Sequence, residues 1–178
     1  MKRRLQLLAI GSMAIFALTA GIAAVSYAQG ANGSSPIDFV VGGGHHSDPD
    51  TQFTLSVHSG PLGQNAKGQM TLKIGDQARI LVDVTCLIID GNQAVATGLI
   101  TRPASFAGQP VVMHAVDNGE PDRSLTPDLL RFSFDGFISS TPNFVTPPAG
   151  QDITGCLFPV LAPVPVTEGN IVVTDAQS

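Results

Sequence analysis

The sequence predicts an all-β fold: a single antiparallel β-sandwich or barrel of about seven to eight strands, meander-like, preceded by an N-terminal signal-peptide helix. Three observations predict it. Apolar and polar residues alternate with a period of two in short runs, and turn residues separate these runs at intervals of roughly ten residues. No segment after residue 28 shows a helical apolar period with caps. The remaining chain of about 150 residues is the size of one domain.

Residues 1–28 have the features of a secretory signal peptide. A positive start, Lys2-Arg3-Arg4, precedes an uncharged apolar stretch from Leu5 to Val25, and Ser26-Tyr27-Ala28 places small residues before a cleavage site. An uncleaved anchor is the alternative, because the stretch is nearly long enough to span a bilayer. Its many small residues make it only moderately hydrophobic. We therefore expect secretion to the periplasm or the external medium, with no stable membrane insertion after cleavage.

The segment 29–50 is rich in Gly, Ser, His and Asp and predicts a flexible N-terminal region. Its one apolar island, Ile37–Val41, predicts a short first strand, followed by a glycine-rich loop. The β domain proper is expected over residues 51–178.

Alternation defines the strands of this domain in order. Phe53, Leu55 and Val57 alternate with polar residues, and a second run puts Met70, Leu72 and Ile74 on one face. The later strands are expected at residues 80–88, 94–101, 111–116, 129–134 and 171–174.

The clearest hairpin runs from Arg79 to Thr101. Its turn, Asp90-Gly91-Asn92-Gln93, supplies the positive φ values that a tight hairpin needs. A strict period of two predicts that one face of the first strand carries Ile80, Val82, Val84, Cys86 and Ile88.

Residues 141–166 hold 6 of the 13 prolines, which excludes a helix or a central strand there. Cys156 lies in this segment, and Cys86 is the only other cysteine. In an oxidising compartment such a pair is usually bridged, and closing a loop of about 70 residues contributes roughly 4 kcal/mol in the chain-entropy model. A catalytic or metal-bound thiolate is the alternative, but no partner lies at motif spacing. We predict a proline-rich loop tied down by a Cys86–Cys156 disulfide.

Several short motifs occur in a fixed order: Val82-Asp83-Val84-Thr85-Cys86-Leu87 with Gly91-Asn92-Gln93-Ala94, then Asp117-Asn118-Gly119-Glu120, and finally Gly169-Asn170-Ile171-Val172-Val173. This order resembles a family of small secreted bacterial proteins of unknown function that share a VTCL/GN hairpin, a DNGE turn and a closing GNIVV strand. The resemblance implies secretion, a β fold and the same disulfide, and it implies no catalytic residues.

Two groups of residues are candidate sites. Asp117, Glu120 and Asp122 present oxygen ligands of the kind that Ca²⁺ prefers, although a plain Asn-Gly turn also explains them. No other cofactor is indicated. The adjacent His45 and His46 would point to opposite sides of an extended chain and so would need a further metal ligand, such as His58 or His114. His58 and His114 are also the candidates for acid–base chemistry if an acid lies beside either of them.

Composition excludes some function classes. Removing residues 1–28 would change the net charge from −5 to −8, so phosphate neutralisation by a nucleic-acid-binding surface is not expected. The part after residue 28 has no Trp or Tyr for stacking sugars, and the chain has no nucleophile elbow. The favoured hypothesis is a secreted non-catalytic β domain with a structural or interaction role, its partner a protein or a small apolar ligand. The alternative is a small apolar-ligand-binding β-barrel, and a hydrolase or calcium-binding module ranks below both.

Overall fold

A computed structural model describes residues 37–120, 125–142 and 145–177. The expected signal peptide lies outside these residues. Within them, no helix has the length and apolar character needed to cross a membrane.

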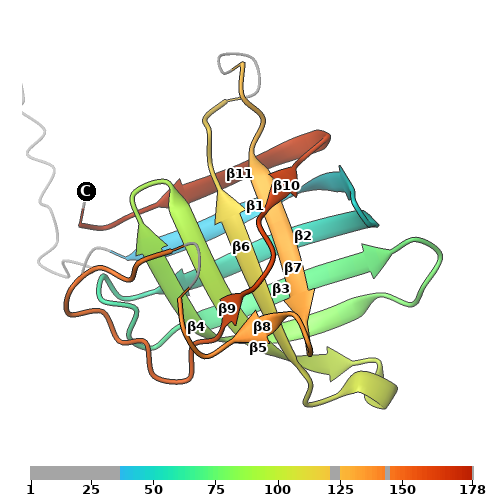
Figure 1. Cartoon of the computed structure of the whole chain (residues 1–178), viewed down its shortest axis with the longest axis horizontal. Coiled ribbons are helices and arrows are strands. Elements are labelled where there is room, and N and C mark those ends of the chain that lie inside the picture. Colours follow the sequence, from blue (N-terminus) through green and yellow to red (C-terminus); the bar gives the residue numbers. More distant parts are fainter. Residues whose placement is uncertain (1–36, 121–124, 143–144, 178) are drawn as a thin grey trace, which may run out of the picture. The chain divides into compact units, whose positions relative to one another are not determined.

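The described chain is all-β, as the sequence predicts. The strands are β1 (Asp38–Ser47), β2 (Asp50–Ser59), β3 (Lys67–Ile74), β4 (Ile80–Asp90), β5 (Gln93–Arg102), β6 (Pro110–Val116), β7 (Leu129–Phe134), β8 (Ile138–Ser139), β9 (Phe158–Pro159), β10 (Val164–Pro165) and β11 (Glu168–Thr174), with one 3-10 turn, η1 (Ala104–Phe106). Nine strands form one antiparallel sheet in the order β10-β7-β6-β5-β4-β3-β2-β1-β11, and β8 pairs with β9 (Figure 1). The expected meander is therefore confirmed for β1 to β7.

The sheet curls into a partial barrel rather than forming a two-sheet sandwich. Its two edge strands, β10 and β11, belong to one stretch of chain, Val164–Thr174 (Figure 1). The start of this stretch pairs with β7 and its end pairs with β1, so it spans the gap between the two edges. Arg131 of β7 adds a second link, since its guanidinium donates to the backbone oxygen of Asp48 in the β1–β2 turn at 3.1 Å.

Two carboxylates bond the free edge of β11. Asp128 accepts from the backbone N–H of Ile171 at 2.7 Å, and Asp117 accepts from that of Val173 at 3.0 Å. The second oxygen of Asp128 accepts from Asn118 N–H at 2.9 Å. Buried backbone donors need hydrogen-bond partners. The two carboxylates accept the hydrogen bonds that a neighbouring strand would accept on this side of β11.

Side chains fill the inside of the curled sheet. Phe53, Leu55 and Val57 point inward as expected, and so do Met70 and Leu72. They pack against inward residues of the later strands, which include Leu87, Ile89, Ala94, Met113, Leu130 and Ile171. The barrel interior is thus a packed hydrophobic core.

The expectation that one face of β4 carries Ile80 through Ile88 is wrong in its second half. Val84 pairs with Gly98 and Cys86 pairs with Thr97, so Thr85 is an extra residue in a β-bulge. A bulge shifts the alternation by one position. Val84 therefore points into the barrel, whereas Cys86 and Ile88 point outward.

The predicted glycine-rich loop before Asp50 is also wrong, because β1 runs through it to Ser47. Gly42 and Gly44 lie where β11 approaches closely. A Cβ on either would come closer than 3.0 Å to backbone oxygens of Asn170 or Glu168. These glycines thus allow two strands to meet rather than breaking a strand.

The outer face of β4, β5 and β6 is covered by a segment that we call the strap, which comprises the described residues 136–142 and 145–163. The Cys86–Cys156 disulfide joins it to β4 with a Cα–Cα distance of 5.4 Å, which confirms the predicted pairing. Strap residues Val145 and Phe158 bury Ile88, Val95 and Val112 in a second apolar cluster. Thr97 of β5 both donates to Leu157 O at 3.1 Å and accepts from Leu157 N–H at 2.9 Å. Only short strands form here, as the prolines predict.

Replacing both cysteines, C86A/C156A, removes the covalent tie between strap and barrel. We expect the free energy of unfolding to fall by about 4 kcal/mol, since the unfolded chain regains loop entropy. Urea unfolding followed by circular dichroism measures the loss, and limited proteolysis should cut within residues 136–163 first. A variant as stable and as resistant to cleavage as the parent would contradict this account of the strap.

Asp128→Asn removes one of the two acceptor oxygens that bond the edge of β11 and the Asn118 turn. We expect a loss of about 1–3 kcal/mol in the free energy of unfolding, because a buried donor loses its partner. Asp135→Asn, at an exposed position just after β7, is the control and should change stability by less than about 0.5 kcal/mol. Equal effects of the two substitutions would show that Asp128 does not hold the edge.

Candidate functional site

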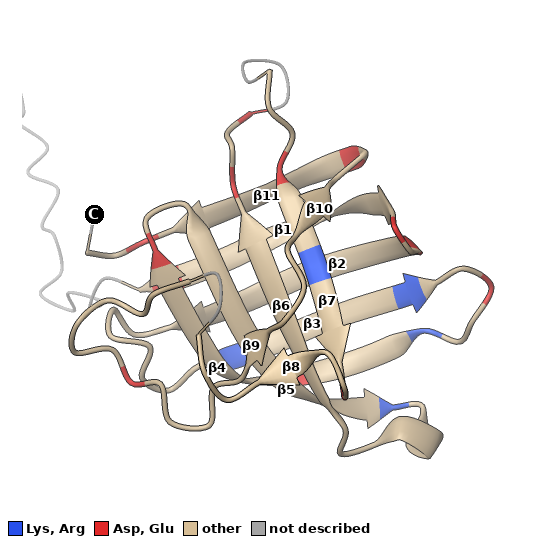
Figure 2. Ribbon diagram, viewed as in Figure 1, with Lys and Arg blue, Asp and Glu red and all other residues tan. Residues whose placement is uncertain are grey.

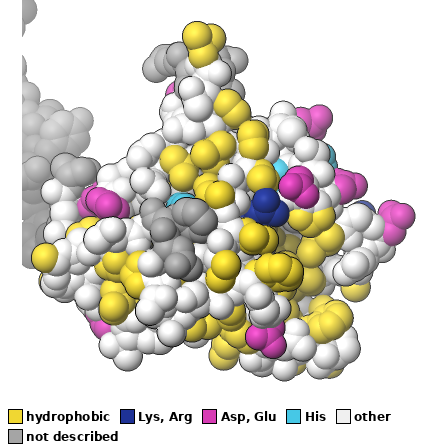
Figure 3. Space-filling model, in the orientation of Figure 1, with side chains coloured by type: hydrophobic (Ala, Val, Ile, Leu, Met, Phe, Trp, Pro, Cys, Tyr) yellow, Lys and Arg dark blue, Asp and Glu magenta, His cyan; other side chains and the backbone are white. Residues whose placement is uncertain are grey.

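Charged groups are sparse on this protein. Figure 2 shows acidic residues mainly near strand ends and turns, and basic residues scattered singly. Figure 3 shows hydrophobic side chains interspersed with polar groups on the face where the strap, β7 and β10 lie. Phe137, Val160 and Leu161 of the strap are exposed hydrophobic residues. This face therefore offers apolar contact area.

A cleft of about 650 Å³ lies on the outer face of the sheet, where β11, β1, β2 and β3 run side by side. Gly44 and Gly169 contribute only backbone to its lining. Its polar and charged side chains come from five places in the chain and are His45, Gln52, Thr54, Thr71, Lys73, Arg79 and Glu168.

Strand register places four of these side chains in one row across the sheet. Glu168 of β11 lies opposite His45 of β1, His45 opposite Gln52 of β2, and Gln52 opposite Lys73 of β3. With strands about 4.8 Å apart, the row is roughly 14 Å long at the backbone. It runs from an acidic end at Glu168 to a basic end at Lys73.

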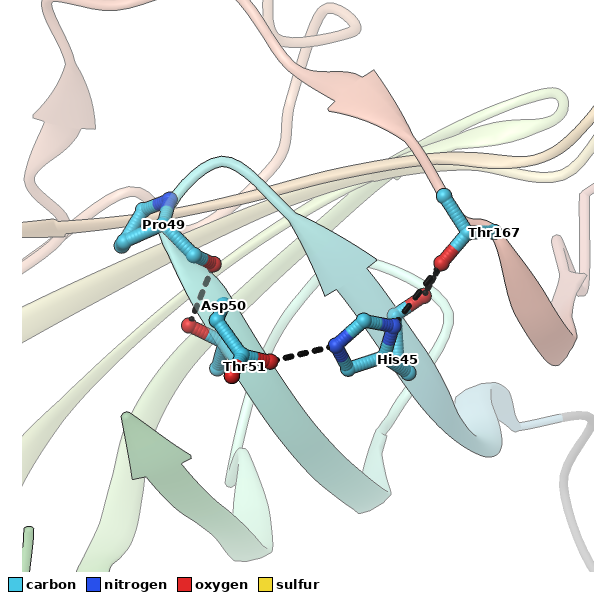
Figure 4. A network of polar contacts seen from close by, with 5 residues as sticks. All are labelled: His45, Pro49, Asp50, Thr51 and Thr167. Carbon is cyan, nitrogen blue, oxygen red and sulfur yellow. Dashed lines mark hydrogen bonds and ion pairs between the residues drawn. The ribbon is translucent and has the colours of Figure 1, made fainter. Parts of the chain in front are cut away.

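His45 is held in the centre of this row by two contacts (Figure 4). Its Nε2 lies 2.5 Å from Asp50 Oδ1, and its Nδ1 lies 2.9 Å from Thr167 Oγ1. The Thr167 hydroxyl donates to the backbone oxygen of His45 at 3.1 Å. A nucleophilic hydroxyl would have to give its proton to the imidazole, as in serine hydrolases. The three residues therefore fix the junction between β11 and β1 and position His45.

Lys73 and Arg79 stand at the other end of the cleft. Lys73 is half-buried and Arg79 is exposed. Within the described residues, the ion pairs are those of His45 with Asp50 and of Arg131 with Asp48. Neither cation of the cleft has an ion-pair or hydrogen-bond partner in that part of the chain. Positive charge without a local counter-ion thus gathers at this end.

Two of the three candidate calcium ligands, Asp117 and Glu120, lie within the described residues. Both carboxylate oxygens of Asp117 accept backbone N–H groups, from Gly119 and Val173. Glu120 is exposed, and Asp122 lies outside the described residues. The described residues contain no cluster of three metal-ligating side chains. Calcium binding at this turn stays a hypothesis, whereas a structural role of Asp117 is visible.

His58 and His114 do not line the cleft. His58 is exposed on β2, opposite Lys67. His114 is buried on β6 between Val95 of β5 and Arg131 of β7, with its Nε2 3.4 Å from Gln93 Oε1. Burial lowers the pKa of His114 to about 4, so it is neutral at physiological pH.

His46, next to His45, faces the barrel interior. It is 1% exposed, and its ring lies 6.3 Å from that of Phe132 and 6.4 Å from that of Phe53. Its two ring nitrogens have no hydrogen-bond partner within the described residues. Burial, then the nearby charge of Arg131, lowers the pKa of His46. The sequence predicts that the adjacent His45 and His46 point to opposite sides of the strand, and the structure confirms this: His45 lines the cleft and His46 faces the core.

Comparison of the chain with protein-family models, with curated proteins and with solved structures finds no match. The resemblance of its motifs to small secreted bacterial proteins therefore stays a prediction.

The two buried histidines predict sensitivity to acid. Their folded-state pKa values lie below the unfolded value of about 6.5, so below that pH the unfolded chain binds more protons and is favoured. Stability should be fully present above pH 6.5 and fall as the pH drops towards 4. His46→Leu removes one of the two groups and two unpaired nitrogens. It should add roughly 1 kcal/mol at pH 7.5 and more at pH 5.

Urea unfolding at the two pH values measures both effects, with His58→Gln as the exposed control that should leave stability and its pH dependence unchanged. A His46→Leu protein that is less stable than the parent at both pH values would show that the imidazole makes a favourable interaction.

Proposed function

We propose that this protein is a secreted, non-catalytic β domain that acts by binding, and that the cleft between β11, β1, β2 and β3 is its contact surface. One observation carries the proposal: the register of four strands aligns Glu168, His45, Gln52 and Lys73 on one hollowed face. Convergent polar side chains in a concave site are the groups that orient a ligand and give a site its specificity.

The rigidity of the cleft supports binding. Its lining residues sit on paired strands, and the contacts of His45 with Asp50 and Thr167 fix the central side chain. A preorganised site loses less conformational entropy when a ligand binds. The same contacts favour binding over acyl transfer, because the Thr167 hydroxyl is directed at a backbone carbonyl.

Secretion is part of the proposal. Residues 1–28 have the charge and hydropathy pattern of a signal peptide, and a disulfide persists in an oxidising compartment. The acidic composition expected after cleavage suits a soluble domain outside the cytoplasm.

A carrier of a small apolar ligand is the second candidate. The filled interior disfavours a ligand in the barrel, since Met70, Leu72 and Leu87 occupy it with no exposed surface. One end of the barrel does hold an apolar hollow of about 250 Å³, lined in part by Ile74, Ile100, Phe106 and Phe134. Ligand pockets usually exceed about 300 Å³, so this hollow suits at most a small molecule.

A ligand screen by NMR on ¹⁵N-labelled protein separates the two candidates. We expect small polar molecules to shift the amide resonances of Gly44, Thr54, Thr71 and Gly169. Short-chain fatty acids are the comparison, and as carrier ligands they would shift those of Ile74, Ile100 and Phe106 instead. Perturbations confined to the second set, or none with any compound, would overturn the proposed function.

A further inference from the structure

We propose that the cleft recognises a polyhydroxylated organic anion, with Lys73 and Arg79 binding its carboxylate or phosphate group and the polar side chains of β2 and β3 binding its hydroxyls. This inference rests on the proposed function and names the ligand class of the same site.

The negative charge of the proposed ligand is inferred from the surroundings of Lys73. Its side chain is half-buried on β3, and it has no ion-pair or hydrogen-bond partner among the residues that the structure describes. A lysine ammonium group that has no local counter-ion and shares a hollow with a second cation attracts an anion. Arg79 lines the same cleft and adds a planar donor suited to carboxylate or phosphate.

The other basic residues in view lack this combination. Lys67 and Arg102 are exposed, and Arg131 is bonded to Asp48 and to Ala162 O. The cleft is therefore the place among the described residues where two cations without partners line one hollow.

The hydroxyl groups of the proposed ligand are inferred from the polar side chains in the middle of the cleft. Thr54 and Thr71 lie opposite each other on β2 and β3, and Gln52 lies opposite Lys73. These three side chains have no hydrogen-bond partner within the described part of the chain, and each can both donate and accept. Sugar-like hydroxyls match such groups.

Charge must supply most of the affinity and selectivity. Phe53 lines the cleft from β2, but its side chain is 3% exposed and packs in the barrel core, so it offers no ring for stacking a sugar. A neutral sugar would thus have only exposed hydrogen bonds that compete with water. At the other end Glu168 carries a negative charge, which fixes the direction in which an anion lies along the row.

Three matched compounds test the inference: glucose, glucuronate and glucose 6-phosphate. They share a ring and differ in one group, which is neutral, a carboxylate or a phosphate. NMR titration at low ionic strength should show glucuronate, glucose 6-phosphate or both shifting the amides of Thr54 and Thr71, while glucose at equal concentration does not. The stronger of the two anions identifies which group the site prefers.

Lys73→Gln should weaken anion binding by about tenfold or more, as expected when a charge-assisted hydrogen bond is lost. Lys67→Gln is the matched control, since Lys67 lies on the same face of β3 at its other end and outside the cleft. It should leave the affinity unchanged. Thermal unfolding of both variants confirms that they are folded.

Equal binding of glucose and the anions, or equal effects of the two substitutions, would overturn the inference. Binding of none of the three, while other polar compounds shift the cleft amides, would also overturn it and leave the proposed function standing. Only the failure of every polar compound at the cleft would count against both.

Discussion

The structure depends on bonding the two edges of one curled sheet. A long antiparallel sheet leaves backbone donors and acceptors free on its outermost strands, and exposed edges invite association with other chains. Here one stretch, Val164–Thr174, serves both edges, and the carboxylates of Asp117 and Asp128 accept the N–H groups of β11 that β1 does not use. That crossing joins the two edges of the curled sheet, and Glu168 and Gly169 of the same stretch line the cleft.

Much of the fold could be predicted from the sequence, because it depends on local alternation. The runs around Phe53, Met70 and Leu130 predict strands whose inward residues do face the core, and the Asp90–Gln93 turn joins the expected hairpin. The disulfide could be predicted because only two cysteines were available. The sequence did not predict the β-bulge at Thr85 or the strand that runs through Gly42 and Gly44. Both depend on which backbone lies alongside, and local alternation does not show that.

The candidate site was beyond prediction for the same reason. His45, Lys73 and Glu168 are far apart in sequence and meet only because four strands have a particular register. The sequence predicts a candidate cation site at the acidic turn of Asp117, whereas in the structure that carboxylate accepts hydrogen bonds from backbone N–H groups. Polar residues in a short chain can serve the backbone or a ligand, and composition alone does not separate these roles.

The pairing of the first and last strands has a consequence for how the molecule folds. Phe39 lies opposite Thr174, and Asp38 accepts a hydrogen bond from Ala176 N–H at 2.9 Å, so the two ends of the described β domain are neighbours. The two segments in contact are separated by most of the β domain in sequence. They can pair only after the strands between them have assembled, and such long-range contacts slow folding. A circular permutant that joins these ends through a short linker and opens the exposed Gly75–Arg79 turn would turn the longest-range pairing into a hairpin. Such a chain should reach the same structure with a lower contact order.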